Sequence, residues 1–130
     1  MNLWKSVAIL AFIALVHGCS SQSLTSKINS TPEAAIDSLL ESAKTNKMET
    51  ARSLCHSSFL EELDTQGGFH EFFAEGHAKL QELEKYTVTS LARSDNKAKF
   101  KVHYTFVDGK REYDIISLKQ DHNAWLITDM

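Results

Sequence analysis

A histidine and an aspartate on neighbouring segments, His103 and Asp114, are the first candidates for chemistry. The segment "AKFKVHYTF" alternates apolar and polar residues, which predicts a strand, and the "DG" at Asp108–Gly109 predicts a two-residue type I′ turn after it. In that register His103 lies opposite Asp114, and Tyr104 lies opposite Tyr113. A histidine–carboxylate pair can transfer protons in catalysis. Because this pair falls on the polar face of the predicted sheet, we interpret it as a surface pair between strands.

Other histidines and the second cysteine give weaker candidates. His70 and His77 lie two helical turns apart, about 10 Å along the axis, so they cannot chelate one metal ion together. Cys55 and His56 are adjacent and would point about 100° apart on a helix, which makes a poor nucleophile–base pair. The favoured interpretations are surface histidines and a buried thiol, and we expect no catalytic residue, metal or cofactor from these groups.

All three tyrosines, Tyr86, Tyr104 and Tyr113, fall on the apolar face of the sheet in the predicted registers. Buried phenol hydroxyls need hydrogen-bond partners, so together they could form the polar end of a ligand pocket. The alternative is that they are core aromatic residues whose hydroxyls reach the rim of the domain. Both interpretations stay open at this stage.

The N-terminus has the pattern of an export signal. Lys5 precedes ten uncharged residues, "VAILAFIALV" at 7–16, a length typical of a signal peptide and too short to span a membrane. The following "VHGC" resembles the lipobox of bacterial lipoproteins. That resemblance implies cleavage between Gly18 and Cys19 and acylation of Cys19. Three acyl chains on Cys19 exceed the two-signal threshold for stable membrane attachment.

The same resemblance predicts the location. Lipoproteins without aspartate after the lipidated cysteine usually reach the outer membrane, and Ser20 stands there, so we expect an anchor in that membrane facing the periplasm. The alternative is an ordinary signal peptide that releases a soluble secreted or periplasmic protein. With Cys19 acylated, Cys55 is the one remaining thiol, so a disulfide within the mature chain is excluded.

The remaining chain predicts one small domain after a tether. We assign residues 1–18 to the signal peptide, 19–30 to the lipidated cysteine and a flexible tether, and 31–130 to a single α+β domain. Thr31 as N-cap with Pro32 after it predicts the start of the first helix. Asn46 and Glu49 form a box-like pattern that predicts a second helix, and a third is expected from about Phe69 to Leu83.

The C-terminal half predicts four strands in a meander. A three-residue loop in "SDNK" would pair Tyr86 with Phe106, and "AWLITD" is the expected last strand. The opening "TPEAAIDSLLESAKTNKMETARSL" and the ending Trp125-Leu126-Ile127 resemble small bacterial lipoproteins of unknown function with the fold of nuclear transport factor two. The resemblance covers residues 31–130. It implies N-terminal helices packed on a curved four-stranded antiparallel sheet, shaped like a cone.

The distribution of charge restricts the partners. Residues 31–85 contain five Lys/Arg and eleven Asp/Glu, a net charge of −6, whereas residues 86–130 contain seven and six, a net charge of +1. No basic stripe with interleaved aromatic residues is evident, so we expect no nucleic-acid partner. The acidic half should avoid anionic lipid, which predicts a domain that stands off its membrane.

These observations favour a non-catalytic binding module for a small apolar molecule or an envelope protein, held at the membrane through Cys19. The alternative is an isomerase or dehydratase with an acid–base group inside the cone, supplied by Glu61, Asp64, His70 or Asp129. A third hypothesis is an assembly role through the exposed face of the sheet. The polar residues Lys99, Lys101 and His103 on that face argue against a large apolar interface.

Overall fold

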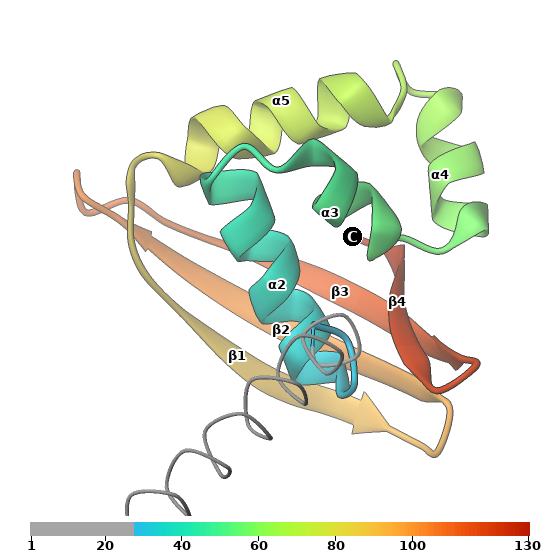
Figure 1. The fold of residues 1–130 in the computed structure, drawn as a ribbon. Coiled ribbons are helices and arrows are strands. Elements are labelled where there is room, and N and C mark those ends of the chain that lie inside the picture. The colour runs from blue at the N-terminus through green and yellow to red at the C-terminus, as the bar shows by residue number, and fades with distance from the viewer. Residues whose placement is uncertain (1–27) are drawn as a thin grey trace, which may run out of the picture.

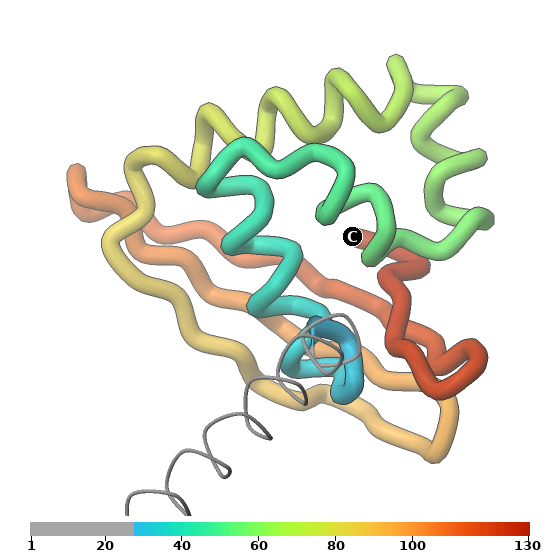
Figure 2. Tube along the Cα trace, in the orientation of Figure 1, coloured from blue at the N-terminus to red at the C-terminus, as the bar shows by residue number. Residues whose placement is uncertain are grey.

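The computed structural model describes residues 28–130, and Figures 1 and 2 show their path. The predicted signal peptide, the cleavage site at Gly18 and the lipidation site at Cys19 lie outside the described residues. The elements are α2 (Pro32–Lys44), α3 (Met48–Ser53), α4 (Ser57–Asp64), α5 (Phe69–Leu80), β1 (Leu83–Arg93), β2 (Lys97–Phe106), β3 (Arg111–Asp121) and β4 (Ala124–Asp129). No helix among these residues is long and apolar enough to cross a membrane.

The four strands form one antiparallel sheet in the order β1-β2-β3-β4, and the helices cover a single face of it (Figure 1). The apolar core lies between these two layers, with Phe100, Val102 and Ile116 of the sheet almost fully buried. The predicted α+β fold is therefore confirmed. Within residues 28–130 it contains four helices instead of the three expected, because α4 forms in the segment that was expected to be a connection.

The start of the first helix agrees with the sequence, but the start of the second does not. The Thr31 side chain accepts a hydrogen bond from the amide of Ala34 at 3.0 Å, as an N-cap does. Asn46 is not a cap: it has a φ of 61°, and the Lys47 amide after it donates to the Ser42 carbonyl at 2.8 Å. Asparagine tolerates this left-handed conformation, so Asn46 ends α2 instead of starting α3.

The predicted register between β2 and β3 is wrong by one residue. The loop contains three residues, 107–109, and is closed by a hydrogen bond from the Phe106 amide to the Lys110 carbonyl at 2.9 Å. Gly109, with a φ of 87°, takes the left-handed position that such a loop requires. His103 therefore lies opposite Tyr113 and not opposite Asp114. A shift of one residue reverses the faces of a strand, so Asp114 faces the helices and Tyr113 faces away from them.

The register between β1 and β2 is also different, but the faces are the predicted ones. Tyr86 lies opposite Tyr104 and not opposite Phe106, a shift of two residues. The turn is tighter than expected, since the Ser94 amide donates to the Lys97 carbonyl at 2.8 Å. Irregularities in the pairing follow Leu83 and Ser90. An even shift leaves each side chain on its face, so Tyr86 stays on the inner face.

The folded domain begins before the predicted boundary at residue 31. Ile28 packs against the core, its carbonyl accepts from the Ser38 hydroxyl at 2.7 Å, and the Asn29 carbonyl accepts from the Trp125 amide at 2.9 Å. Within residues 28–130 the core is one continuous cluster, and every buried side-chain nitrogen or oxygen has a hydrogen-bond partner. These residues thus have the properties of a unit that folds by itself.

Candidate functional site

A cavity of about 220 Å³ lies between the helices and the inner face of the sheet. Most of its wall is apolar, and α5 contributes the largest share of it. The lining residues are Leu39, Leu40, Ala43, Ala51, Phe69, Phe72, Phe73, Glu75, Gly76, Lys79, Leu80, Tyr104, Phe106, Asp114 and Met130.

The cavity exists because small residues stand where core side chains are expected. On α5 the apolar stripe runs through Phe69, Phe73 and Leu80, and Gly76 occupies a position of that stripe between them. A Cβ atom added to Gly76 would meet nothing within 4 Å, so this glycine does not serve close packing. Ala43 of α2 and Ala51 of α3 are the other small residues in the wall. Three helices thus leave one shared space unfilled.

A tyrosine and a carboxylate form the polar end of the cavity. Tyr104 on β2 and Asp114 on β3 both face inward, and Tyr104 is 4% exposed. Burial raises the pKa of the Tyr104 hydroxyl well above its ordinary value, and the nearby negative charge of Asp114 raises this pKa further. Tyr104 therefore stays protonated at neutral pH and presents a neutral hydroxyl beside a carboxylate.

Charged side chains surround the rim next to this polar end. Lys79 of α5 donates to the Glu112 carboxylate at 2.7 Å, and both side chains are about half exposed, so this pair contributes at most about 1 kcal/mol to stability. Glu75 is also part of the wall and is exposed. Glu75, Glu112 and Asp114 outnumber Lys79, so the rim has an excess of negative charge.

The structure separates the three tyrosines that the sequence placed together. Tyr104 lines the cavity, whereas Tyr86 is outside its wall and donates to the Asp37 carboxylate at 2.8 Å. Partial burial and this hydrogen bond raise the pKa of Tyr86 to about 12. Tyr113 lies on the opposite face of the sheet, 59% exposed, with the Lys101 ammonium 4.2 Å from its ring centre. Its predicted place on the apolar face followed from the wrong register.

None of the acid–base candidates named from the sequence lines the cavity. Glu61, Asp64, His70 and Asp129 are exposed and outside its wall. The inward carboxylate is Asp114, which the predicted register had assigned to the outer face. A three-residue loop at 107–109 would have placed Asp114 correctly, and the "DG" pair is compatible with that loop as well.

The histidines have structural or surface positions. His77 binds the Ala43 carbonyl through Nδ1 at 2.7 Å, His103 lies beside Tyr113 on the outer face, and His70 is exposed. In residues 28–130 no three histidine, cysteine or acidic side chains are arranged to hold a metal ion.

Cys55 is a buried thiol, as the sequence favoured, with 6% of its surface exposed. Its Sγ donates to the Ala51 carbonyl at 3.4 Å, whereas the neighbouring His56 caps α4 by accepting from the Ser58 amide at 3.1 Å. Burial raises the pKa of the Cys55 thiol to about 12, against a smaller opposite effect of Arg52. The two residues therefore do not act as a nucleophile and its base.

Alkaline pH is expected to weaken the fold through Cys55. In the unfolded chain this thiol ionises with a pKa near 9.0, but in the folded protein its pKa is about 12. Its contribution to stability is therefore complete below about pH 9 and is lost progressively as the pH rises toward 12. Urea unfolding at increasing alkaline pH should show this loss, and the Cys55→Val variant should show a shallower decline. Equal declines in the two proteins would contradict the assignment, since the tyrosines contribute equally to both.

Comparison with known proteins shows that the fold of this chain is similar to that of solved structures. No protein-family model and no curated protein sequence matches the chain. A crystal structure from Campylobacter jejuni, provisionally named an NTF2-like (nuclear transport factor two-like) transpeptidase, has a TM-score of 0.62 with 15% identity over 75% of this chain and 96% of that one. A provisionally named dehydratase of the NTF2-like family from Streptomyces avermitilis has a TM-score of 0.39 with 11% identity, over 75% and 93%. The first likeness and the observed topology show that the chain has the NTF2-like α+β fold.

Proposed function

We propose that this protein is a lipid-anchored domain of the cell envelope that binds a small, mainly apolar molecule in its cavity and does not transform it. The observation that carries the proposal is the apolar cavity of about 220 Å³ with Tyr104 and Asp114 at one end. A few convergent polar groups in an otherwise apolar concavity are typical of a binding site. The NTF2-like fold itself is compatible with binding modules and with enzymes.

The wall of the cavity restricts the chemistry of the ligand. Its volume is somewhat larger than the roughly 150 Å³ apolar cavity that accepts benzene, so a single-ring molecule or a short chain is the appropriate size. Asp114 lies near the Tyr104 hydroxyl, and the rim has excess negative charge. The free lone pairs of both groups can accept hydrogen bonds. A ligand with a hydroxyl or amino group therefore complements this end.

The lipid anchor is supported by the sequence at 7–19, where an apolar segment ends in "VHGC". Three acyl chains on Cys19 would hold the domain at a membrane irrespective of what its surface binds. A signal peptide cut without acylation, which releases a soluble protein, is the competing proposal. Extraction of the protein from native membranes and its mass distinguish the two.

Native mass spectrometry of the protein in mild detergent tests both parts of the proposal. The expected mass is that of a chain that begins at an acylated Cys19 and carries a further small molecule. A chain without acyl groups would remove the anchor but leave the cavity proposal standing. An acylated chain with nothing bound, at every detergent and energy tried, would contradict binding of a small molecule and favour a protein partner.

An acid–base enzyme is the second candidate, since Asp114 and Tyr104 are adjacent inside the cavity. A carboxylate can accept a proton, and a protonated tyrosine can stabilise developing negative charge on an oxygen. Replacement of Asp114 by asparagine distinguishes the candidates with benzyl alcohol and toluene as probes. For a binding site we expect about tenfold weaker binding of benzyl alcohol and unchanged binding of toluene, because the charge-assisted hydrogen bond from the ligand hydroxyl becomes a weaker neutral one. Conversion of the captured native molecule by the wild type, and not by Asp114→Asn, would establish catalysis instead.

A further inference from the structure

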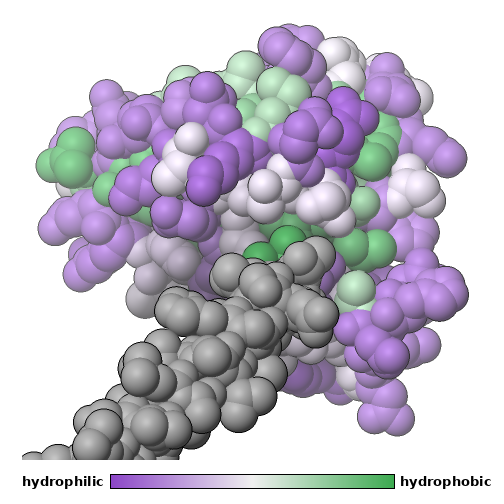
Figure 3. Space-filling view, in the orientation of Figure 1, coloured by the Kyte–Doolittle hydropathy of each residue, from purple (hydrophilic) through white to green (hydrophobic). Residues whose placement is uncertain are grey.

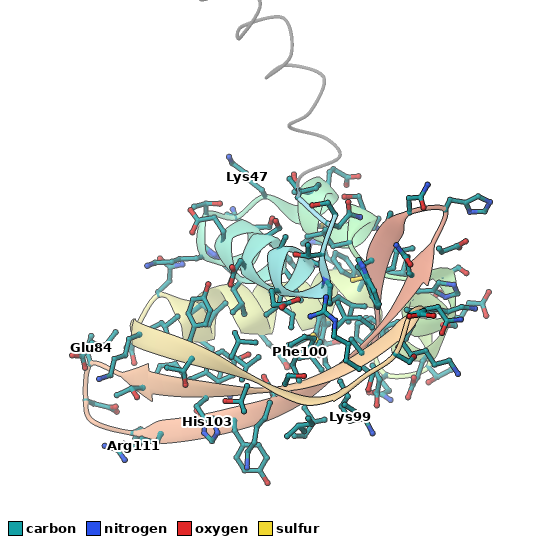
Figure 4. The ribbon with its side chains drawn as sticks, turned by 90° about the horizontal axis from the view of Figure 1, so that it is seen from below. Lys47, Glu84, Lys99, Phe100, His103 and Arg111 are labelled. Atoms are coloured by element: carbon teal, nitrogen blue, oxygen red, sulfur yellow. The ribbon has the colours of Figure 1, made fainter. Side chains whose placement is uncertain are left out.

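The outer face of the sheet, which no helix covers, contains more basic than acidic residues, with Asp121 at one end of it. On β1, β2 and β3 the outward positions from 85 to 119 alternate with the buried positions. Figure 4 shows Lys99 and His103 directed away from the helices, whereas Phe100 lies on the helical side. The basic residues of this outer face are Lys85, Lys97, Lys99, Lys101, Arg111 and Lys119.

The acidic residues of β3 are divided between the two faces, because Asp121 shares the outer face with Lys119. Glu112 and Asp114 are on the inner face, at the cavity and its rim. The helical side, mostly hydrophilic in Figure 3, belongs to the half of the chain with a net charge of −6. The near-neutral total for residues 86–130 therefore includes two acidic residues that lie on the inner face, away from the lysines of the outer face. Because charges further apart than about 10 Å are largely screened at moderate salt, a partner at the outer face would encounter mainly lysines.

A shallow groove concentrates these charges at one end of the sheet. It is lined by Arg93, Lys97, Lys99 and Lys119, together with the hydroxyls of Ser94, Ser117 and Thr128. Arg93 is paired with Glu33 at 3.0 Å, but the three lysines form no ion pair within residues 28–130.

Two of these lysines lie directly opposite each other. Lys97 pairs with Lys119 in the β2–β3 register, an arrangement that destabilises a sheet unless something compensates the charge. Hydroxyl groups beside paired ammonium groups suit the oxygen atoms of phosphate. The groove therefore complements a phosphate-bearing partner.

The outer face also exposes side chains suited to a lipid interface. Tyr113 is 59% exposed with Lys101 over its ring, and Leu91 at the edge of the sheet is 50% exposed. Tyrosine and lysine are the side chains that place an apolar body in the headgroup region and a polar tip in water.

The N-terminal end of the domain lies at the same end of the sheet as the groove. Asn29 bonds Trp125 at the start of β4, and Glu33 of α2 bonds Arg93 at the end of β1. From Cys19 to Ile28 the chain contains nine peptide steps, which reach at most about 30 Å. A membrane anchor at Cys19 would therefore keep anionic headgroups within reach of the groove.

We propose that the outer face of the sheet docks on the surface of a membrane with anionic phospholipids, with Lys97, Lys99 and Lys119 binding the headgroup phosphates. Such docking departs from the expectation of a domain that stands off its membrane, because the basic outer face, and not the acidic helical half, would meet the lipid. It depends on the proposed lipid anchor at Cys19 only because that anchor would bring the domain close to a membrane. Flotation of the domain 28–130 with vesicles tests docking without any anchor, because this domain lacks Cys19. The docking proposal and the anchor proposal can therefore be contradicted independently.

The experiment compares phosphatidylcholine vesicles with mixed phosphatidylcholine–phosphatidylglycerol vesicles at low salt. We expect binding to the mixed vesicles alone, lost at high salt. The Lys97→Gln/Lys119→Gln double variant should bind about 25-fold more weakly, since each basic residue near an anionic surface contributes about fivefold. It should remain folded, because it removes a repulsive pair. The matched Lys44→Gln/Lys47→Gln variant, changed on the helical side, should bind like the wild type.

Four results would overturn the proposal. Equal binding to neutral and mixed vesicles would show apolar insertion, and no binding to mixed vesicles at low salt would show that the face is not a lipid surface. Tight binding of single-stranded DNA or polyglutamate by a domain that ignores vesicles would assign the face to a soluble polyanion instead. Equal loss in both double variants would show an effect of total charge and not of this surface.

Discussion

Replacing Phe100 with alanine is expected to lower the free energy of unfolding by about 3–5 kcal/mol, a large part of the 5–15 kcal/mol typical of a small domain. Phe100 is 2% exposed and lies on β2, between β1 and β3, facing the helices (Figure 4). Its removal deletes contacts with both layers and leaves a void in the centre of the core. Urea unfolding at neutral pH, followed by circular dichroism, measures the change.

The neighbouring Lys99 gives the matched control for this substitution. Lys99 is exposed and points to the opposite face of the same strand, so Lys99→Ala should change the free energy of unfolding by less than about 0.5 kcal/mol. Similar losses for Phe100→Ala and Lys99→Ala would contradict the assignment of faces on β2. A loss below about 1 kcal/mol for Phe100→Ala would contradict its place in the core.

Replacing Gly76 with leucine is expected to stabilise the domain and abolish ligand binding at the same time. Gly76 lies inside α5, where glycine costs about 1 kcal/mol relative to a good helix former. Its position opens into the cavity, with nothing within 4 Å of an added Cβ atom, so a leucine side chain would occupy the space of a ligand. Thermal unfolding should show a higher midpoint, and titration with benzyl alcohol should show at least about tenfold weaker binding.

Gly76→Ala separates the two effects. Alanine gives the same gain in helix propensity but adds a single methyl group, so we expect the stabilisation with most of the binding retained. Binding by Gly76→Leu equal to that of the wild type would show that the probe binds elsewhere. Loss of stability in both variants would show that Gly76 is needed for packing, contrary to the open space beside it.

The elements with long periodic patterns were predictable from the sequence, and the short ones were not. α2 and β2 have clear apolar stripes, and Thr31 and Pro32 mark a start that the structure reproduces. α4 contains eight residues and buries Phe59 and Leu63. A window this short does not distinguish a helix from a loop, because the helix depends on contacts with β4 and α5.

The inner and outer faces of β3 could not be fixed from the sequence. The "DG" pair fits a two-residue and a three-residue loop, and the choice between them exchanges Tyr113 with Asp114. Pairing apolar residues with apolar residues across β2 and β3 favoured the two-residue loop. That loop would place Tyr113 on the inner face and Asp114 on the outer face. The actual arrangement does the reverse: Asp114 lies at the polar end of a cavity, and Tyr113 lies on a basic surface. Two positions at the proposed binding surfaces thus broke the pattern that core packing predicts.

The cavity could not be predicted from the sequence, for a different reason. It arises from Ala43, Ala51 and Gly76, which come from three helices and meet only after folding. Considered alone, each alanine is an ordinary helical residue and the glycine is a weak helix former, so none of them indicates a cavity. The size of a cavity depends on side chains from segments that are distant in the sequence. A local sequence pattern therefore does not indicate whether a cavity forms.

NMR on the isotope-labelled domain with benzyl alcohol shows whether the cavity binds a small molecule with a donor group. We expect saturable shifts and intermolecular NOEs from the aromatic ring to Phe73 and Phe106, with the hydroxyl directed to Tyr104 and Asp114. NOEs to Tyr113 on the outer face, or none at saturating probe, would contradict this expectation.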